Sequence, residues 1–145
     1  MQPTPSVSVI IPNYNHALFL KQRIESVLNQ TDQDFELIIL DDCSTDHSKT
    51  IIESYRNNPK VSQIIYNQQN SGSVFKQWIK GIELCQGDYV WIAESDDYAS
   101  EFFLQETLSA LQNDASLGMV FTKSLAVNEK GETINNTWEA KENRW

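Results

Sequence analysis

Short apolar segments recur along the chain at intervals that are typical of strands separated by helices. The first is rich in β-branched residues and stops at Pro12. The five predicted strands cover residues 7–11, 35–40, 61–66, 89–93 and 119–122. Their lengths and composition favour strands that are covered on both faces of a sheet.

The segments between these strands carry apolar residues at helical spacing. The predicted helices cover residues 17–28, 51–55, 74–85 and 104–111. Gly87 follows the third of them, where a left-handed helix cap is expected. Ser44 or Asp46 is suitably placed to cap the second helix. This alternation predicts an α/β fold with a mostly parallel sheet and flanking helices. After the last strand, residues 128–131 predict a turn between extended segments.

Length and charge narrow the class of protein. A chain of 145 residues is expected to form one domain, residues 1–145. The net charge is -9 and no run of Lys or Arg occurs, which excludes a nucleic-acid surface. No apolar stretch reaches the roughly 20 residues of a membrane span, and the N-terminus lacks signal-peptide features. Cys43 and Cys85 have neither metal-ligand nor disulfide spacing, so we expect reduced thiols in the cytoplasm.

Polar side chains follow each of the first four predicted strands. The four clusters occupy residues 12–15, 41–46, 70–73 and 94–97. In parallel α/β sheets, ligands bind beyond the carboxyl ends of the strands, which meet at one edge. The sequence therefore predicts a binding site that is assembled from these four loops.

The fourth cluster contains three carboxylates, those of Glu94, Asp96 and Asp97. Carboxylates this close repel each other unless a cation lies among them. Mg²⁺ or Mn²⁺ would remove the repulsion, and it leaves coordination positions for diphosphate oxygens. We therefore expect Asp96 and Asp97 to hold a divalent metal. The alternative is that these two residues merely cap a helix beginning near Ser100.

The second cluster begins with Asp41, which follows its strand directly. A carboxylate there can accept a hydrogen bond from a nucleotide base or ribose, and a charge-assisted bond to uracil would select that base. For Ser44 and Asp46 an Asx-turn into the next helix explains the residues equally well.

Together these motifs resemble the family 2 glycosyltransferases with the GT-A fold, a Rossmann-like fold that binds nucleotide-diphospho-sugars. The resemblance covers residues 6–127 and depends on four ordered motifs at residues 8–15, 41–46, 70–72 and 87–97. It implies a transferase that moves a sugar from a nucleotide diphosphate donor, commonly a UDP-sugar, with inversion at the anomeric carbon. It further implies a divalent metal, a glycan or lipid-linked acceptor, a homo-oligomer, and polysaccharide synthesis in the cytoplasm or at the inner membrane face.

The resemblance also assigns roles to single residues. It implies that Pro12, Tyr14 and Asn15 bind the nucleotide sugar, with Pro12 and Tyr14 near its base, and that Asp41 binds the base. From the later motifs, Asn70 and Gly72 would shape the loop near the base and ribose. Asp96 would contact the ribose or the metal, and Asp97 would coordinate the metal beside the diphosphate.

The chain departs from the family pattern at three positions. Cys43 stands where relatives usually carry Gly, so a left-handed backbone there would be strained. Glu94 replaces the first Asp of the acidic motif, and Ile79 replaces an Asn that contacts the donor in many relatives. None of these changes removes the aspartate pair.

The general base is the main gap. An inverting transferase needs a carboxylate that takes the proton of the acceptor hydroxyl. The glutamates after the acidic motif and its following helix lie in no recognisable context, namely Glu129, Glu132, Glu139 and Glu142. We therefore expect the base beyond Trp145, in an acceptor-side portion that this truncated chain lacks. The sequence identifies no catalytic residue.

Other classes of protein fit less well. A phosphoacceptor receiver would need an acidic pair after the first strand, and a dinucleotide oxidoreductase or a nucleotidyltransferase would need a Gly-rich loop there. Residues 12–15 supply neither. A non-catalytic module that binds nucleotide sugars on the same fold remains open.

Overall fold

The computed structural model describes residues 4–128 and 131–134. The chain forms two compact units, residues 1–106 and residues 107–145. The first unit contains a four-stranded parallel sheet with the strand order β3-β2-β1-β4. Its strands are β1 (Val7–Asn13), β2 (Phe35–Asp41), β3 (Val61–Tyr66) and β4 (Tyr89–Ile92).

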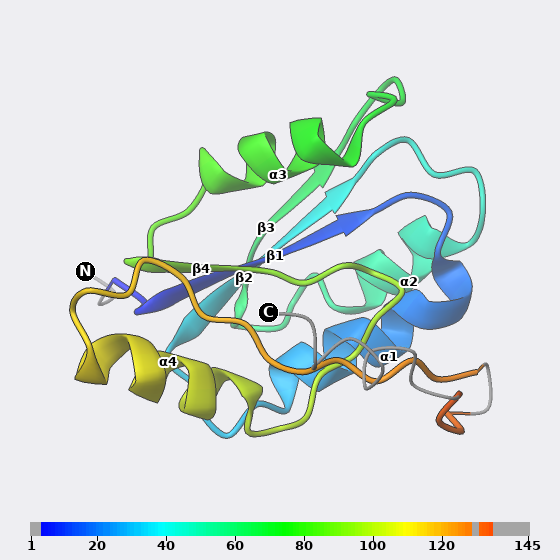
Figure 1. The fold of residues 1–145 in the computed structure, drawn as a ribbon. Helices are drawn as coiled ribbons and strands as arrows, with labels where there is room; N and C mark the ends of the chain where they lie inside the picture. The colour runs from blue at the N-terminus through cyan, green and yellow to red at the C-terminus, as the bar shows by residue number, and fades with distance from the viewer. Residues whose placement is uncertain (1–3, 129–130, 135–145) are drawn as a thin grey trace. The chain divides into compact units, whose positions relative to one another are not determined.

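Helices cover both faces of this sheet. The four helices are α1 (Ala17–Leu28), α2 (Ser48–Ser54), α3 (Val74–Ile82) and α4 (Phe103–Asn113). In the first unit, α1 and α2 lie on one face and α3 lies on the other (Figure 1). The prediction of a parallel α/β sheet with flanking helices is confirmed, and the first four strands and all four helices occur where the periodicity indicated.

The two central strands form the core because helices cover them on both sides. All seven residues of β1 and all seven of β2 are buried. On the α3 side, Ile10, Ile38 and Leu40 pack together as one cluster. Helix α3 approaches β1 closely at Gly81, where a Cβ atom would lie 2.6 Å from Ile10 Cγ2. Only glycine allows this spacing.

The strand order determines where a ligand can bind. From β1 the chain adds β2 and β3 on one side, and then returns to place β4 on the other side of β1. The loop after β1 leads to α1 on one face of the sheet and the loop after β3 leads to α3 on the other, and this reversal of strand order leaves a crevice at the carboxyl edge. The polar clusters predicted from the sequence lie at this edge.

Three sequence predictions are wrong. Residues 119–122 do not form a strand: Met119 and Phe121 are 76% and 86% exposed, and no described strand pairs with this segment. Helix α3 ends at Ile82 rather than at residue 85. Gly87 does not have a left-handed backbone; it is needed because a Cβ atom there would lie 2.8 Å from the backbone nitrogen of Ser8.

In the second unit, the middle of the turn predicted at residues 128–131, residues 129 and 130, lies outside the described residues. Val127 and Thr133 form an antiparallel bridge, and the Gly131 amide donates to the Asn128 carbonyl. Glu129, Glu139 and Glu142 lie outside the described residues. Within residues 4–128 and 131–134, no helix is long and apolar enough to cross a membrane.

Candidate functional site

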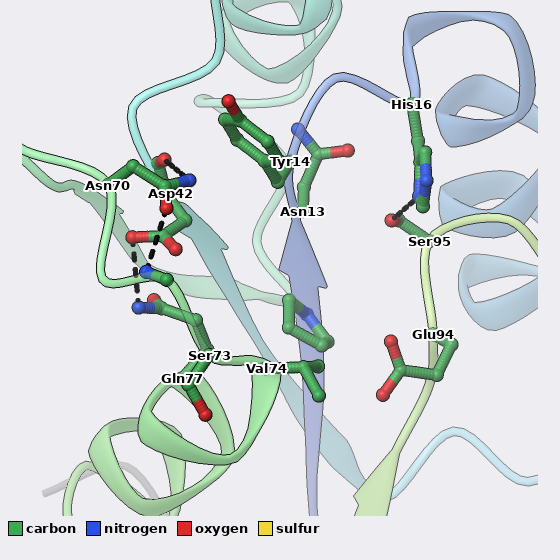
Figure 2. A pocket seen from close by; sticks show the side chains of 12 residues that line it. Asn13, Tyr14, His16, Asp42, Asn70, Ser73, Val74, Gln77, Glu94 and Ser95 are labelled. Atoms are coloured by element: carbon green, nitrogen blue, oxygen red, sulfur yellow. Dashed lines mark hydrogen bonds between the residues drawn. The ribbon is translucent and has the colours of Figure 1, made fainter.

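A pocket of about 390 Å³ opens at the carboxyl edge of the sheet (Figure 2). Its volume lies in the range of small-ligand sites. The lining comes from the ends of β1, β2 and β4, from the loop after β3 and from the first turns of α3. The lining residues are Pro12, Asn13, Tyr14, His16, Asp42, Asn70, Gly72, Ser73, Val74, Gln77, Glu94 and Ser95.

The two aspartates at the end of β2 face opposite sides of the sheet, because side chains alternate along a strand. Asp41 is 3% exposed; it accepts a 2.8 Å hydrogen bond from Asn13 Nδ2 and a 3.0 Å bond from the Ser44 amide. It does not line the pocket. Asp42 lines it from the side that α3 covers. The structure therefore places Asp42, and not Asp41, at the pocket wall.

Asp42 is held rigidly in that position. Its Oδ1 accepts hydrogen bonds from Asn67 Nδ2 at 2.6 Å and from Gln77 Nε2 at 3.0 Å. Its Oδ2 accepts a 2.7 Å bond from the Ser71 hydroxyl. The backbone carbonyl of Asp42 accepts from Asn70 Nδ2 at 3.1 Å. These bonds fix both the carboxylate and the loop after β3, so this end of the pocket is preorganised.

Asn15 joins the loops after β1 and β2 and does not line the pocket. Its Oδ1 accepts a 2.8 Å bond from the Thr45 amide, and its own amide donates to the Ser44 hydroxyl at 2.9 Å. Asp46 accepts from Ala17 at the start of α1 and from Ser48 at the start of α2, both at 2.9 Å. The N-cap of α2 is His47, so neither Ser44 nor Asp46 is the capping residue that the sequence indicated, although Asp46 accepts the amide of the first helical residue.

Glu94 forms the opposite wall of the pocket. Its Oε1 accepts a 2.7 Å hydrogen bond from the indole Nε1 of Trp78. Burial raises the pKa of the Glu94 carboxyl; the Trp78 bond lowers it, and Asp96 and Asp97 raise it. Figure 2 shows the Glu94 side chain across the pocket from Asp42, with the end of β1 between them.

His16 also lines the pocket, at the junction of the loops after β1 and β4. Its Nδ1 lies 2.8 Å from the hydroxyl of Ser95, which is 1% exposed (Figure 2). The contact ties the first loop to the acidic loop. A lone histidine in the sequence carried no signal of this role.

Asp96 and Asp97 stand on an exposed turn that the Asp97 amide closes by donating to the Glu94 carbonyl at 3.2 Å. They do not line the pocket. The helix-cap alternative is wrong, because α4 starts at Phe103 and its Leu104 amide donates instead to Gln30 Oε1 at 2.8 Å.

The acidic turn fits a divalent metal by its chemistry. Neither Asp96 nor Asp97 accepts a hydrogen bond from another described residue, so their carboxylate oxygens are available. Within the described residues, no three His, Cys, Asp or Glu side chains already form a metal cluster. Mg²⁺ usually binds through one or two carboxylates together with ligand phosphates, so such a cluster is not required.

The pocket thus contains four of the predicted residues, namely Pro12, Tyr14, Asn70 and Gly72. Asn15, Asp41, Asp96 and Asp97 lie outside its lining. The sequence did not single out the remaining lining residues as ligand contacts. Asp42 could have been found from strand alternation alone, whereas Gln77 looks like an ordinary polar position of an amphipathic helix.

Cys43, which stands where relatives usually carry Gly, has a left-handed backbone with φ of 65°. Both cysteines of the chain are free thiols. A side chain with a Cβ atom is strained in this conformation. The strain lies next to Asp42, at the wall of the pocket.

The sequence matches the family described as glycosyl transferase family 2 over residues 8–144. It is 34% identical to the chondroitin synthase of Escherichia coli over 137 residues, which is 94% of this chain and 20% of that protein. It is 33% identical to the poly(ribitol-phosphate) beta-N-acetylglucosaminyltransferase TarS of Staphylococcus aureus over 128 residues, 86% of this chain and 22% of TarS. The chain thus spans about a fifth of either relative.

Solved structures share the fold. S. aureus TarS 1-349 in complex with UDP-GlcNAc aligns with a TM-score of 0.69 and 26% identity, over 83% of this chain and 38% of that one. The mannosyltransferase PcManGT of Pyrobaculum calidifontis, in complex with GDP-Man and Mn²⁺, aligns with a TM-score of 0.65 and 19% identity, over 76% of this chain and 33% of that one. The second likeness concerns the fold alone.

Proposed function

Because the chain belongs to glycosyl transferase family 2 and has the GT-A fold, we propose that it is the donor-binding part of an inverting, metal-dependent glycosyltransferase. The donor is a nucleotide diphosphate sugar, a UDP-sugar in the first instance, and the acceptor is a hydroxyl of a glycan or a lipid-linked glycan. The observation that carries the proposal is the pocket between Asp42 and Glu94 at the strand-order reversal.

The base and ribose occupy the Asp42 end of this pocket. Tyr14 is 46% exposed and provides a ring on which a base can stack. Asn70 and Gly72 shape the loop beside it, and the left-handed Gly72, with φ of 70°, allows the backbone to turn there. Asp41 supports this end through Asn13 instead of touching the ligand.

The diphosphate extends from the pocket toward the acidic turn. Asp96 and Asp97 hold a divalent cation there, and the cation supplies charge neutralisation for the departing nucleotide diphosphate. Glu94 lies between the pocket and this turn, where its carboxylate can accept a hydrogen bond from a ribose or sugar hydroxyl.

The proposal is supported by the named relatives. TarS is described as an N-acetylglucosaminyltransferase and one of its structures contains UDP-GlcNAc. The E. coli relative is a chondroitin synthase. These descriptions favour a UDP-sugar donor and a role in polysaccharide synthesis.

Calorimetry tests donor binding. The chain is titrated with UDP, GDP and UDP-GlcNAc, with and without Mn²⁺, as wild type and as Asp97→Ala. Glu83→Ala is the control, because it removes an exposed carboxylate that does not line the pocket. We expect metal-dependent binding that Asp97→Ala abolishes and Glu83→Ala preserves. Equal binding by all three proteins without metal would contradict the proposal.

A non-catalytic nucleotide-sugar module is the second candidate, because the chain spans only about a fifth of the named relatives. Donor hydrolysis separates the two functions. A transferase chain extended past Trp145 is expected to hydrolyse UDP-GlcNAc slowly in the absence of acceptor. Binding with no turnover in the extended chain would favour the module.

A further inference from the structure

Arg23 of α1 is a buried cation that lies beneath the acidic turn. The residue is 4% exposed. Its Nε donates a 2.7 Å hydrogen bond to the backbone carbonyl of Glu94. Its guanidinium carbon lies 5.7 Å from the ring centroid of Trp91 in β4, within the range of a cation–π contact. Arg23 is therefore fixed between the last strand of the sheet and the turn that follows it.

The Glu94 carbonyl makes a second contact that matters for the turn. It accepts the Asp97 amide at 3.2 Å in addition to Arg23 Nε. The bond that closes the turn and the bond that anchors it to α1 thus share one oxygen atom. Asp96 and Asp97 follow directly from this atom, so the orientation of their backbone depends on it.

The charges around Arg23 agree with this arrangement. Burial lowers the pKa of the guanidinium, and the carboxylates of Asp97, Asp96 and Glu94 act in the opposite direction. A buried charge is costly unless opposite charges compensate it. Within the described residues, Nη1 of Arg23 is buried and has no hydrogen-bond partner. A buried guanidinium with an unpaired N–H group costs free energy, so core packing alone does not explain why an arginine occupies this position.

We propose that Arg23 is a positioning residue, which holds the Glu94–Asp97 turn in the conformation that presents both aspartates to the metal and the donor diphosphate. That Arg23 anchors the turn is inferred from its own contacts. That this anchoring strengthens binding of the metal and the diphosphate rests on the proposed function. One measurement tests the anchoring and a second tests the effect on metal binding.

Amide exchange tests the anchoring without any ligand. The exchange rate of the Asp97 amide is measured in the wild-type chain, in Arg23→Met and in Val27→Ala, which creates a cavity on the buried face of the same helix. We expect Arg23→Met to accelerate Asp97 exchange about tenfold relative to the amides of β1. Val27→Ala is expected to change both sets of amides alike. Equal behaviour of the two variants would overturn the proposal.

Arg23→Lys keeps the inference testable should Arg23→Met fail to fold. Lysine retains the charge, but it lacks the planar guanidinium that bonds the carbonyl while it stacks on Trp91. We expect Asp97 exchange in this variant to lie between the rates of wild type and Arg23→Met. A rate equal to that of wild type would mean that charge alone suffices, which contradicts positioning by the Nε bond.

Titration with MnCl₂ in the presence of UDP tests the consequence for ligand. Loss of a supporting contact behind a metal site typically weakens metal binding, and we expect about a tenfold loss in Arg23→Met. Val27→Ala is expected to bind as wild type does. Removal of a nearby cation would by itself tighten Mn²⁺ binding, so unchanged or tighter binding by Arg23→Met would overturn the proposal. If the wild-type chain binds neither probe, the proposed function fails and the exchange measurement alone decides on Arg23.

Discussion

Gln77 and Trp78, adjacent residues of α3, contact carboxylates at opposite walls of the pocket. Gln77 Nε2 donates to Asp42 Oδ1 at 3.0 Å, and Trp78 Nε1 donates to Glu94 Oε1 at 2.7 Å. Asp42 follows β2 and Glu94 follows β4, the strands on either side of β1. One helical turn therefore sets the separation of the two walls, and a shift of α3 would move both contacts together.

Replacing Trp78 by Phe tests the second of these contacts. The variant keeps an aromatic ring and loses the N–H that Glu94 accepts. Because a partly buried carboxylate then lacks its donor, we expect a loss of about 1–2 kcal/mol in the free energy of unfolding. Urea denaturation measures this value. In a double-mutant cycle with Glu94→Leu, which removes the acceptor, the two losses should not add; full additivity would show that the bond contributes nothing.

Asp41 and Asp42 are expected to respond differently to substitution. Asp41→Ala removes the buried carboxylate that accepts hydrogen bonds from Asn13 Nδ2 and from the Ser44 amide, so the chain should lose about 1–3 kcal/mol of stability. Its affinity for UDP, measured on the folded protein by calorimetry, should change little. Asp42→Ala should weaken UDP binding about tenfold or more, because the wall and the loop after β3 both lose their anchor. The reverse pattern would return the base contact to Asp41.

Cys43→Gly is expected to stabilise the chain. Its left-handed backbone, with φ of 65°, strains any residue with a Cβ atom. Relief of that strain exceeds the extra entropy that glycine gives the unfolded chain, for a net gain of about 0.5–1 kcal/mol. Thermal unfolding provides the measurement. Cys43→Ala is the control, since it removes the thiol but keeps the strain; a gain of the same size in this control would refute the explanation.

Gly81→Ala should destabilise the interface between α3 and β1. The added methyl group would lie 2.6 Å from Ile10 Cγ2, so the core must move. Overpacking of this kind costs about 1–3 kcal/mol. Denaturant unfolding of the single variants and of Gly81→Ala with Ile10→Ala tests the cause. The double variant is expected to lose less than the sum of the two single losses.

Glu53, which does not line the pocket, provides a pH-dependent contribution to stability. Hydrogen bonds from Arg56 and Tyr66 lower the pKa of Glu53 from 4.5 to about 2. Since the folded state favours the charged form, this contribution is present above pH 4.5 and is lost as the pH falls toward 2. The unfolding free energy of Glu53→Gln should therefore vary less with pH in that window. Arg56→Met should flatten the curve in the same way, and curves parallel to wild type would contradict the assignment.

Hydrophobic spacing was sufficient to predict most of the fold. Residues 35–40 form a nearly continuous apolar run, as strands covered on both faces do, and residues 17–28 repeat apolar positions at helical spacing. Residues 119–122 have the same apolar composition, yet they form no strand. A strand also needs a neighbour for its backbone hydrogen bonds, and composition does not reveal one.

The sequence predicted correctly which loops form the site, but it predicted less well which side chains line the pocket. The motifs located the ends of β1, β2 and β4 correctly, but Asp41 was chosen where Asp42 lines the pocket. The choice depends on which face each side chain takes, and this is fixed only when the strand end is known. Arg23 was missed because its role depends on a contact with Glu94, 71 positions later in the chain.

The position of β1 in the middle of the sheet has a consequence for how the pocket comes into being. Val7 pairs with Phe35 on one side and with Tyr89 on the other. As the polypeptide leaves the ribosome, β1 can pair with β2 early. The backbone groups on its other edge lack hydrogen-bond partners until β4 has been synthesised. Such late, distant pairing slows folding and exposes the waiting edge to other chains. Glu94 follows β4 in the chain, so the pocket wall that it forms cannot be in place until β4 has joined β1.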